Sequence, residues 1–101
     1  MNYNGIEISE DHLAEVCRRW KVQELSLFGS VLREDFHAAS DVDVLVVFQP
    51  QAPWSLWELI DMRAELQQVL GRPVDLVEKD AIRNPFRRHE IIKNRKVVYA
   101  A

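Results

Sequence analysis

Two aspartates interrupt a valine-rich run in the middle of this chain, and they restrict its fold more than any other feature. Asp41 and Asp43 lie at the start of the segment from Ser40 to Phe48, whose later residues are all apolar. Valine-rich segments of this length favour a β-strand. Residues two apart in a strand point to the same face, so the two carboxylates lie side by side and repel each other. A cation would relieve this repulsion, and ligation by oxygen alone favours Mg²⁺ or Mn²⁺ over zinc.

A glycine and a serine follow the preceding apolar segment, Leu25 to Phe28, which is also predicted to be a strand. Gly29 lets the backbone approach a ligand closely, and the amides of Gly29, Ser30 and Val31 are expected to face a phosphate there. Phosphate-binding amides beside a divalent-metal site together indicate that the chain binds a metal-triphosphate.

A third carboxylate lies in another short apolar segment, from Pro73 to Val77, directly after a glycine-containing turn. We expect Asp75 to be enclosed by its apolar neighbours in this strand. If the strand lies beside that of Asp41 and Asp43, three carboxylates converge on one sheet face. The alternative is that these strands simply carry solvent-exposed aspartates. The combination with the glycine-serine pair favours a functional site.

Helical periodicity and capping residues predict three helices, which alternate with the short strands and give an α+β (α/β two-layer) domain. Cys17 lies on the apolar stripe of the first helix and is expected to be a buried hydrophobic residue. Trp54 and Trp57 either both complete the core, or one of them is exposed for a partner. The predicted helices are Ser9–Trp20, Trp54–Leu70 and Ala81–Lys93, the last interrupted at Pro85, and a final strand covers Lys96–Tyr99.

The length of 101 residues predicts a single domain, residues 1–101, without room for a second domain that would hold an acceptor. The formal charge of −3 argues against general nucleic-acid binding. One basic stretch is either a solvated helix face or a surface for an acidic or RNA-binding partner; it contains Arg83, Arg87, Arg88 and Lys93. With no membrane-spanning run and no signal segment, the expected location is the cytoplasm.

These residues resemble the nucleotidyltransferase superfamily to which polymerase β belongs. The resemblance covers residues 7 to 99 and is carried by the glycine-serine pair, a ten-residue gap, Asp-x-Asp and a later Val-Asp-Leu strand. The compact form, with Phe-Gly-Ser, Arg33 and Ser-Asp-x-Asp before an apolar strand, is similar to the minimal nucleotidyltransferase (MNT) domain. The resemblance implies a polymerase β-like nucleotidyltransferase fold, with a small mixed sheet, the aspartates on one face and helices packed on the other.

The resemblance also implies roles for the acidic residues. Asp41 and Asp43 would hold two Mg²⁺ ions, with Mn²⁺ as an alternative, that bind the triphosphate of ATP. Asp75 would complete one metal site and orient the attacking hydroxyl or accept its proton.

Four further residues are candidates for nucleotide binding. Gly29 and Ser30 would hold the outer phosphates. Arg33 either reaches the triphosphate or pairs with a nearby acid, and Ser40 either contributes to the site or only turns the chain. Val31 departs from the pattern, because many members have a second basic residue there, and one phosphate contact is expected to be missing.

Many MNT proteins are antitoxins of two-gene systems whose toxin is a HEPN-domain ribonuclease. The resemblance therefore implies transfer of AMP from Mg-ATP to a hydroxyl, expected to be a tyrosine, of a cognate HEPN toxin, with which the chain forms a hetero-oligomer. One alternative is a binding module that neutralises the toxin without transfer, and another is an enzyme for a small-molecule acceptor. The presence of all three aspartates favours an enzyme.

Overall fold

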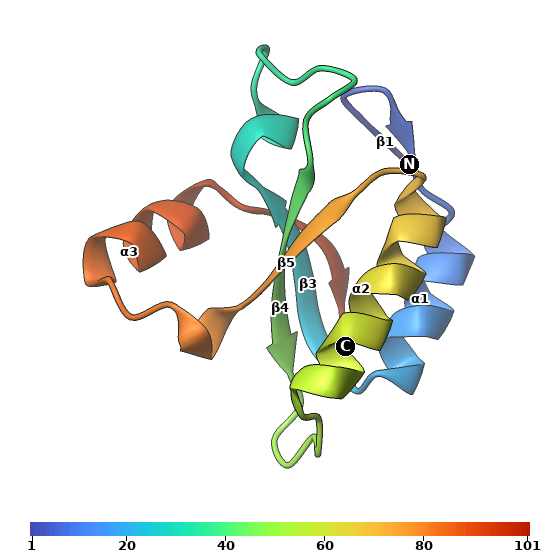
Figure 1. Cartoon of the computed structure of the whole chain (residues 1–101), viewed down its shortest axis with the longest axis vertical. Helices are drawn as coiled ribbons and strands as arrows, with labels where there is room; N and C mark the ends of the chain where they lie inside the picture. Colours follow the sequence, from blue (N-terminus) through green and yellow to red (C-terminus); the bar gives the residue numbers. More distant parts are fainter.

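A mixed four-stranded sheet forms the centre of the computed structural model, which describes residues 1–101 (Figure 1). The strand order is β5-β4-β3-β6. Strand β4 pairs antiparallel with β3 and parallel with β5, and β6 pairs antiparallel with β3 on the other side. The mixed sheet is thus confirmed, and its strands are β3 (Val22–Phe28), β4 (Val42–Phe48), β5 (Val74–Glu78) and β6 (Lys96–Ala100).

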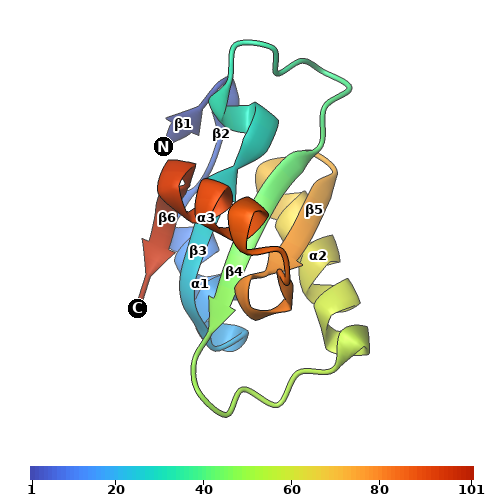
Figure 2. The same ribbon diagram turned by 90° about the vertical axis from the view of Figure 1, so that its left-hand side faces the viewer.

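Two helices, α1 (Glu10–Arg19) and α2 (Leu56–Leu70), cover one face of the sheet (Figure 2). Ser9 caps α1 by accepting a hydrogen bond from the His12 amide at 3.3 Å, as its position before the apolar stripe predicts. Buried side chains from both helices pack against every second residue of β4, and these strand residues are Val42, Val44 and Val46. The main core therefore lies between the sheet and this helical layer.

The third helix, α3 (Pro85–Asn94), lies over the opposite face of the sheet, which corrects the expectation that the helices pack on one face only (Figure 2). Its residue Ile91 is buried in a second, smaller apolar cluster with Phe28, Leu45 and Ile82. This cluster explains the placement, because Leu45 points away from the main core and needs an apolar partner on its own side.

The start of α3 corrects a second expectation, that of a helix running through Pro85 from residue 81. A 3₁₀ turn, η2 (Lys79–Ala81), comes first, and α3 begins at the proline itself. Proline lacks an N–H and therefore suits the first helical position, where no partner for it exists. The Asn84 side chain caps the amides of Phe86 and Arg87 at 2.9 and 3.2 Å.

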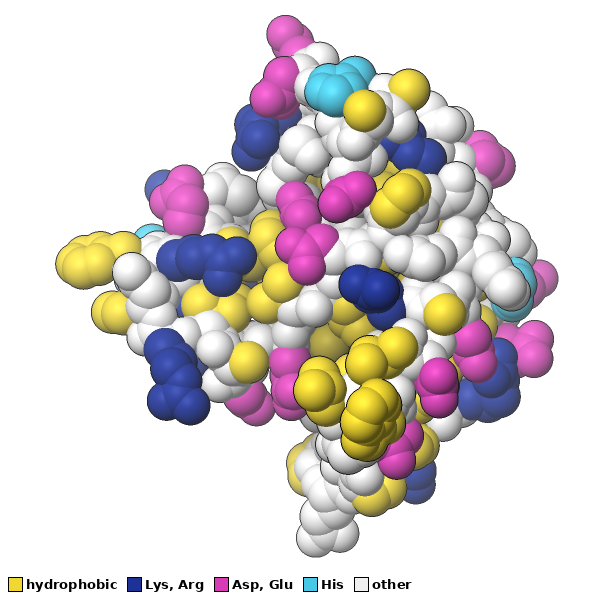
Figure 3. Space-filling model, viewed as in Figure 1, with side chains coloured by type: hydrophobic (Ala, Val, Ile, Leu, Met, Phe, Trp, Pro, Cys, Tyr) yellow, Lys and Arg dark blue, Asp and Glu magenta, His cyan; other side chains and the backbone are white.

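The two tryptophans at the start of the second helix have different environments. The Trp54 indole donates a hydrogen bond of 2.7 Å to the Trp20 carbonyl, and the two rings pack edge to face. Trp57 is 76% exposed, next to Leu56 and Ile60, which are also exposed. Hydrophobic side chains accordingly gather over the first turns of α2 (Figure 3).

A short hairpin of β1 (Asn2–Tyr3) and β2 (Ile6–Glu7) precedes α1 and was not expected from the sequence. Its two-residue strands are too short to show a periodic pattern. None of the helices combines the length and the apolar content that crossing a bilayer requires.

Candidate active site

The register of two parallel strands places two aspartates side by side. Asp43 of β4 and Asp75 of β5 are paired positions across the sheet. Asp41 lies one residue before β4 and is exposed. Asp43 shares a sheet face with Leu45, so the aspartates lie on the face that carries α3. The predicted meeting of the two strands is confirmed, but Asp75 is exposed rather than enclosed.

A glycine allows the Asp43 carboxylate to occupy its position. Gly29 begins the 3₁₀ turn η1 (Gly29–Leu32), directly after β3, with a φ of 72°. A β-carbon at this residue would overlap the Asp43 carboxylate oxygen. The glycine therefore serves two purposes, because it adopts a left-handed conformation and leaves space for the acid.

The surroundings of Asp43 disfavour the negative charge of its carboxylate. Partial burial raises the pKa of this carboxyl, and the negative charges of Asp75 and Asp41 raise it further. The Ser30 backbone amide and the Arg33 guanidinium lower the pKa but do not offset the increase. A divalent cation beside the carboxylates would remove this repulsion.

The donor set of the site suits a hard divalent cation. The aspartates offer only oxygen ligands, which fits Mg²⁺ or Mn²⁺ and does not fit a structural zinc site. The chain brings no three His, Cys, Asp or Glu side chains together as a preformed metal site. A bound cation would take further ligands from phosphate oxygens and water, as Mg²⁺ commonly does.

Two of the predicted nucleotide-binding residues have other partners in this structure. The Arg33 guanidinium pairs with the Asp35 carboxylate at 3.1 Å, and both side chains are mostly exposed. The Ser40 hydroxyl accepts a hydrogen bond from the His37 amide at 3.2 Å, which closes the turn before β4. Val31, the position at which the sequence departs from the family pattern, is buried in the main core. Its side chain therefore cannot contact a phosphate.

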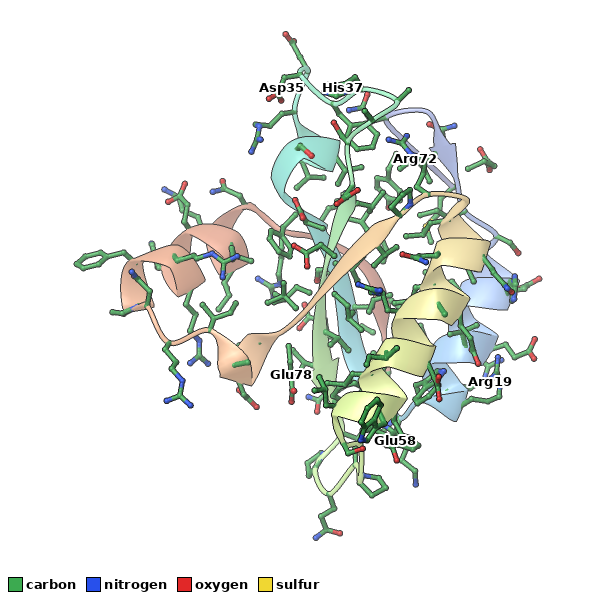
Figure 4. All side chains as sticks on the ribbon, in the orientation of Figure 1. Arg19, Asp35, His37, Glu58, Arg72 and Glu78 are labelled. Atoms are coloured by element: carbon green, nitrogen blue, oxygen red, sulfur yellow. The ribbon has the colours of Figure 1, made fainter.

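Arg72 holds the loop that leads to Asp41 and Asp43, and this role was not identified from the sequence. Its Nη2 atom donates hydrogen bonds to the carbonyls of His37 and Ser40 at 2.8 and 2.6 Å. Its guanidinium also lies over the Phe36 ring, 4.6 Å from the centroid. Figure 4 labels Arg72 and His37, which lie on the turn before β5 and on the loop before β4. The sequence feature that could have indicated this role is the position of the arginine, between a helix-ending glycine and a proline and just ahead of the Asp75 strand.

A cavity of about 510 Å³ adjoins Gly29 on the face that carries α3. One wall is formed by η1 and the residue on each side of it, and the other by α3. A cavity of this volume suits a ligand of nucleoside size. The lining residues are Phe28, Gly29, Leu32, Arg33, Glu90, Ile91 and Asn94.

The single cysteine takes no part in the site. Cys17 is fully buried in α1, on the other side of the sheet. Burial raises the pKa of its thiol to about 12, against the opposing effect of the Arg18 charge. The thiol therefore stays protonated and cannot act as a nucleophile near neutral pH.

Comparison with known proteins gives several matches that cover most of the chain. The sequence profile of the nucleotidyltransferase domain family matches residues 9–98. The protein adenylyltransferase MntA of Thermococcus cleftensis is 36% identical over 88 residues, which are 87% of this chain and 84% of that protein. A crystal structure of a toxin-antitoxin with AMP-PNP superposes with a TM-score of 0.72 at 21% identity, covering 93% of this chain and 75% of that chain.

A further solved structure has the same fold. It contains an MNT antitoxin in complex with a tri-AMPylated HEPN toxin of Shewanella oneidensis. The TM-score is 0.64 at 20% identity, and the match covers 91% of this chain and 70% of that chain. The similarity extends through the sheet and its helices, so the expected α+β fold is confirmed.

Proposed function

This chain belongs to the nucleotidyltransferase domain family. We propose that it is an antitoxin that transfers AMP from Mg-ATP to a hydroxyl of a cognate HEPN ribonuclease toxin. The acceptor hydroxyl is expected to be that of a tyrosine. The observation that carries the proposal is the pairing of Asp43 with Asp75, beside the backbone of Gly29. The 36% identity to MntA supports a protein as the acceptor.

The proposed reaction is an in-line displacement at the α-phosphorus of ATP. The acceptor oxygen forms a bond to this phosphorus, while the bond from phosphorus to the oxygen that bridges to the β-phosphate breaks, and pyrophosphate leaves. Asp75 accepts the proton of the attacking hydroxyl. Its exposure supports this role, because a hydroxyl on another protein can reach it.

Asp41 and Asp43 would hold the divalent cations, with Asp75 completing one of the two metal sites. When bound, Mg²⁺ or Mn²⁺ neutralises the phosphate charge and stabilises the attacking and leaving oxygens. The unrelieved repulsion at Asp43 supports this assignment.

The nucleotide would be bound beside the turn that follows β3. The backbone amides of Gly29 and Ser30 hold the outer phosphates, and the cavity between η1 and α3 takes the nucleoside. Arg33 turns from Asp35 to the triphosphate, because an exposed ion pair contributes only about 0–1 kcal/mol and is readily exchanged.

The class of partner protein is inferred from the structural similarity and from the proposed reaction. A related fold occurs in complex with an AMPylated HEPN toxin, which supports a toxin of that class as both acceptor and binding partner. The proposal therefore includes a hetero-oligomer between this chain and its toxin.

The intact mass of a candidate HEPN toxin tests the proposal after incubation with this chain, ATP and Mg²⁺. We expect one or more added AMP units, and none when Asp43→Asn or Asp75→Asn replaces the unaltered chain. Asp61→Asn is the matched control, because it removes an exposed carboxylate from α2, across the sheet from the site. An unmodified toxin that is nevertheless bound and inactive would establish neutralisation by complex formation alone.

A further inference from the structure

The positive charge of this chain is concentrated in one segment near its C-terminal end, and the remaining residues together have a net negative charge. Residues 79–95, here called the cationic arm, contain six Lys and Arg residues and two acidic residues. The remainder of the chain contains seven basic and fourteen acidic residues. The arm therefore has a formal charge of +4 on a protein whose remaining charge is −7, and it includes η2, α3 and the residues around them.

Most of this positive charge has no partner within the chain. Arg95 pairs with Glu24 at 2.9 Å, and Arg88 reaches Asp80 only at 3.9 Å. The other four basic residues form no ion pair, and these are Lys79, Arg83, Arg87 and Lys93. These charges therefore do not stabilise the fold through pairing.

The arginines lie at the end of α3 where positive charge is electrostatically unfavourable. Arg83 lies just before α3, and Arg87 and Arg88 lie in its first turn, which contains no acidic residue. The N-terminus of a helix carries partial positive charge, so cations there are unfavourable. Cations at this end of a helix, with no acidic residue to offset them, indicate a functional surface. An anionic group of a binding partner would offset the unfavourable charge.

An aromatic side chain completes the surface. Phe86 lies between these arginines in the first turn of α3 and is 85% exposed, more than any other large hydrophobic residue of the chain. Figure 3 shows basic and hydrophobic side chains gathered over α3. An exposed aromatic residue beside arginines is typical of a protein interface, where these residue types contribute most of the affinity.

The cationic arm lies over the sheet face that carries the carboxylates. Ile82 and Ile91 of the arm pack against Leu45, two residues after Asp43 on the same strand and the same face. The cavity beside Gly29 is closed on one side by α3. A partner seated on the arm would therefore lie on the same side of the sheet as Asp43 and Asp75.

We propose that the cationic arm docks an acidic segment of the protein that accepts AMP, with Arg83 and Arg87 bound to carboxylates and Phe86 inserted into an apolar recess of that protein. This inference rests on the proposed function. A short acidic segment fits better than RNA, because the remainder of the chain has a formal charge of −7 and would repel an extended polyanion.

Fluorescence anisotropy with labelled peptides tests the arm without any need for catalysis. The probes are a tyrosine peptide flanked by glutamates, the same peptide with glutamines, and an oligouridine RNA of equal length. We expect the acidic peptide to bind most tightly, and Arg83→Glu/Arg87→Glu to weaken it about tenfold, which corresponds to two lost ion pairs.

The matched control is Arg18→Glu/Arg63→Glu, which makes the same change of charge on α1 and α2, across the sheet. It should leave the affinity for the acidic peptide within about twofold, since screening limits the range of surface charges. Phe86→Ala is the second arm variant and keeps every charge. Circular dichroism verifies that each variant is folded. We expect Phe86→Ala to weaken binding of an intact HEPN toxin, because only a folded protein offers an apolar recess for the ring.

Two results would overturn the proposal: equal affinity for the acidic and glutamine peptides, or arm-dependent binding of RNA that is tighter than that of the acidic peptide. AMP transfer to the same peptides, followed by mass with ATP and Mg²⁺, separates this inference from the proposed function. Transfer without preference for the acidic peptide contradicts the arm proposal alone. Arm-dependent binding with no transfer even to an intact HEPN toxin contradicts the proposed function alone.

Discussion

The Arg72 Nη2 atom lies 2.6 Å from the Ser40 carbonyl oxygen and thereby ties the turn before β5 to the loop before β4. The amide of Val42 donates a hydrogen bond of 2.9 Å to the Pro73 carbonyl, which adds a backbone link at the same place. Asp41 and Asp43 follow the loop, and Asp75 follows the turn. Arg72 and the pairing of β4 with β5 together hold the loop and the turn that lead to the three carboxylates.

Replacing Arg72 should affect turnover more than nucleotide affinity. Arg72→Lys keeps the charge but loses the planar guanidinium that lies over Phe36 and reaches both carbonyls through Nη2, so we expect kcat for AMP transfer to fall about tenfold with a smaller change in KM for ATP. Urea unfolding should show a loss of about 1–2 kcal/mol from the missing hydrogen bonds. Arg63→Lys on the exposed face of α2 is the control. An unchanged kcat together with the loss of stability would show that Arg72 is only structural.

Two glycines with similar backbone angles should respond differently to alanine. Gly29 and Gly71 have φ values of 72° and 68°, but a β-carbon on Gly71 would meet nothing within 4 Å. Gly71→Ala should cost about 1 kcal/mol of stability, from backbone strain alone, and leave activity intact. Gly29→Ala should in addition displace the Asp43 carboxylate and abolish AMP transfer. Equal activity of the two variants would contradict this role of Gly29.

Two serines should change stability in opposite directions when replaced by alanine. The Ser26 hydroxyl is buried in β3 and has no hydrogen-bond partner. Removing an unsatisfied buried hydroxyl should stabilise the fold by up to about 1 kcal/mol in urea unfolding. Ser9→Ala should destabilise by about 1 kcal/mol, because Ser9 caps α1. A destabilised Ser26→Ala variant would indicate that the hydroxyl has a partner in solution.

Glu65 should make stability depend on pH in the acidic range. Burial raises the pKa of this carboxyl, but hydrogen bonds from Arg19 and Trp20, each 3.1 Å long, leave it below its ordinary value of 4.5. A folded-state pKa below the unfolded one stabilises the protein above about pH 4.5, and this contribution disappears as pH falls through the folded value.

Urea unfolding of Glu65→Gln as a function of pH measures this contribution. The variant should be less stable than the unaltered chain at neutral pH, and the difference should shrink below about pH 4.5. Glu34→Gln, which removes an exposed carboxylate from a loop, is the control. A stability difference for Glu65→Gln that stays constant with pH would mean that its ionisation does not contribute.

Much of the secondary structure could be predicted from the sequence. The first helix and its Ser9 cap, the valine-rich strand and the glycine that ends the second helix all lie within a few residues of their predicted positions. The start of the third helix was misplaced, although proline at the first helical position is a known signal. The placement of Asp75 in a strand was correct, but its exposure depends on what covers that strand.

The sequence by itself determined the positions of the main helices and of the strands of the central sheet, and which of these elements carry the acids and the close-approach glycine. Caps, turn residues and periodicity act within one or two turns of the chain, so they are visible locally. Only the tertiary structure decided that Asp43 pairs with Asp75, that Arg72 joins the two approaches to the site, and that α3 shares the face of the carboxylates. Strand register and the side on which a helix packs depend on contacts between residues far apart in the sequence, where burial of apolar faces outweighs local preference.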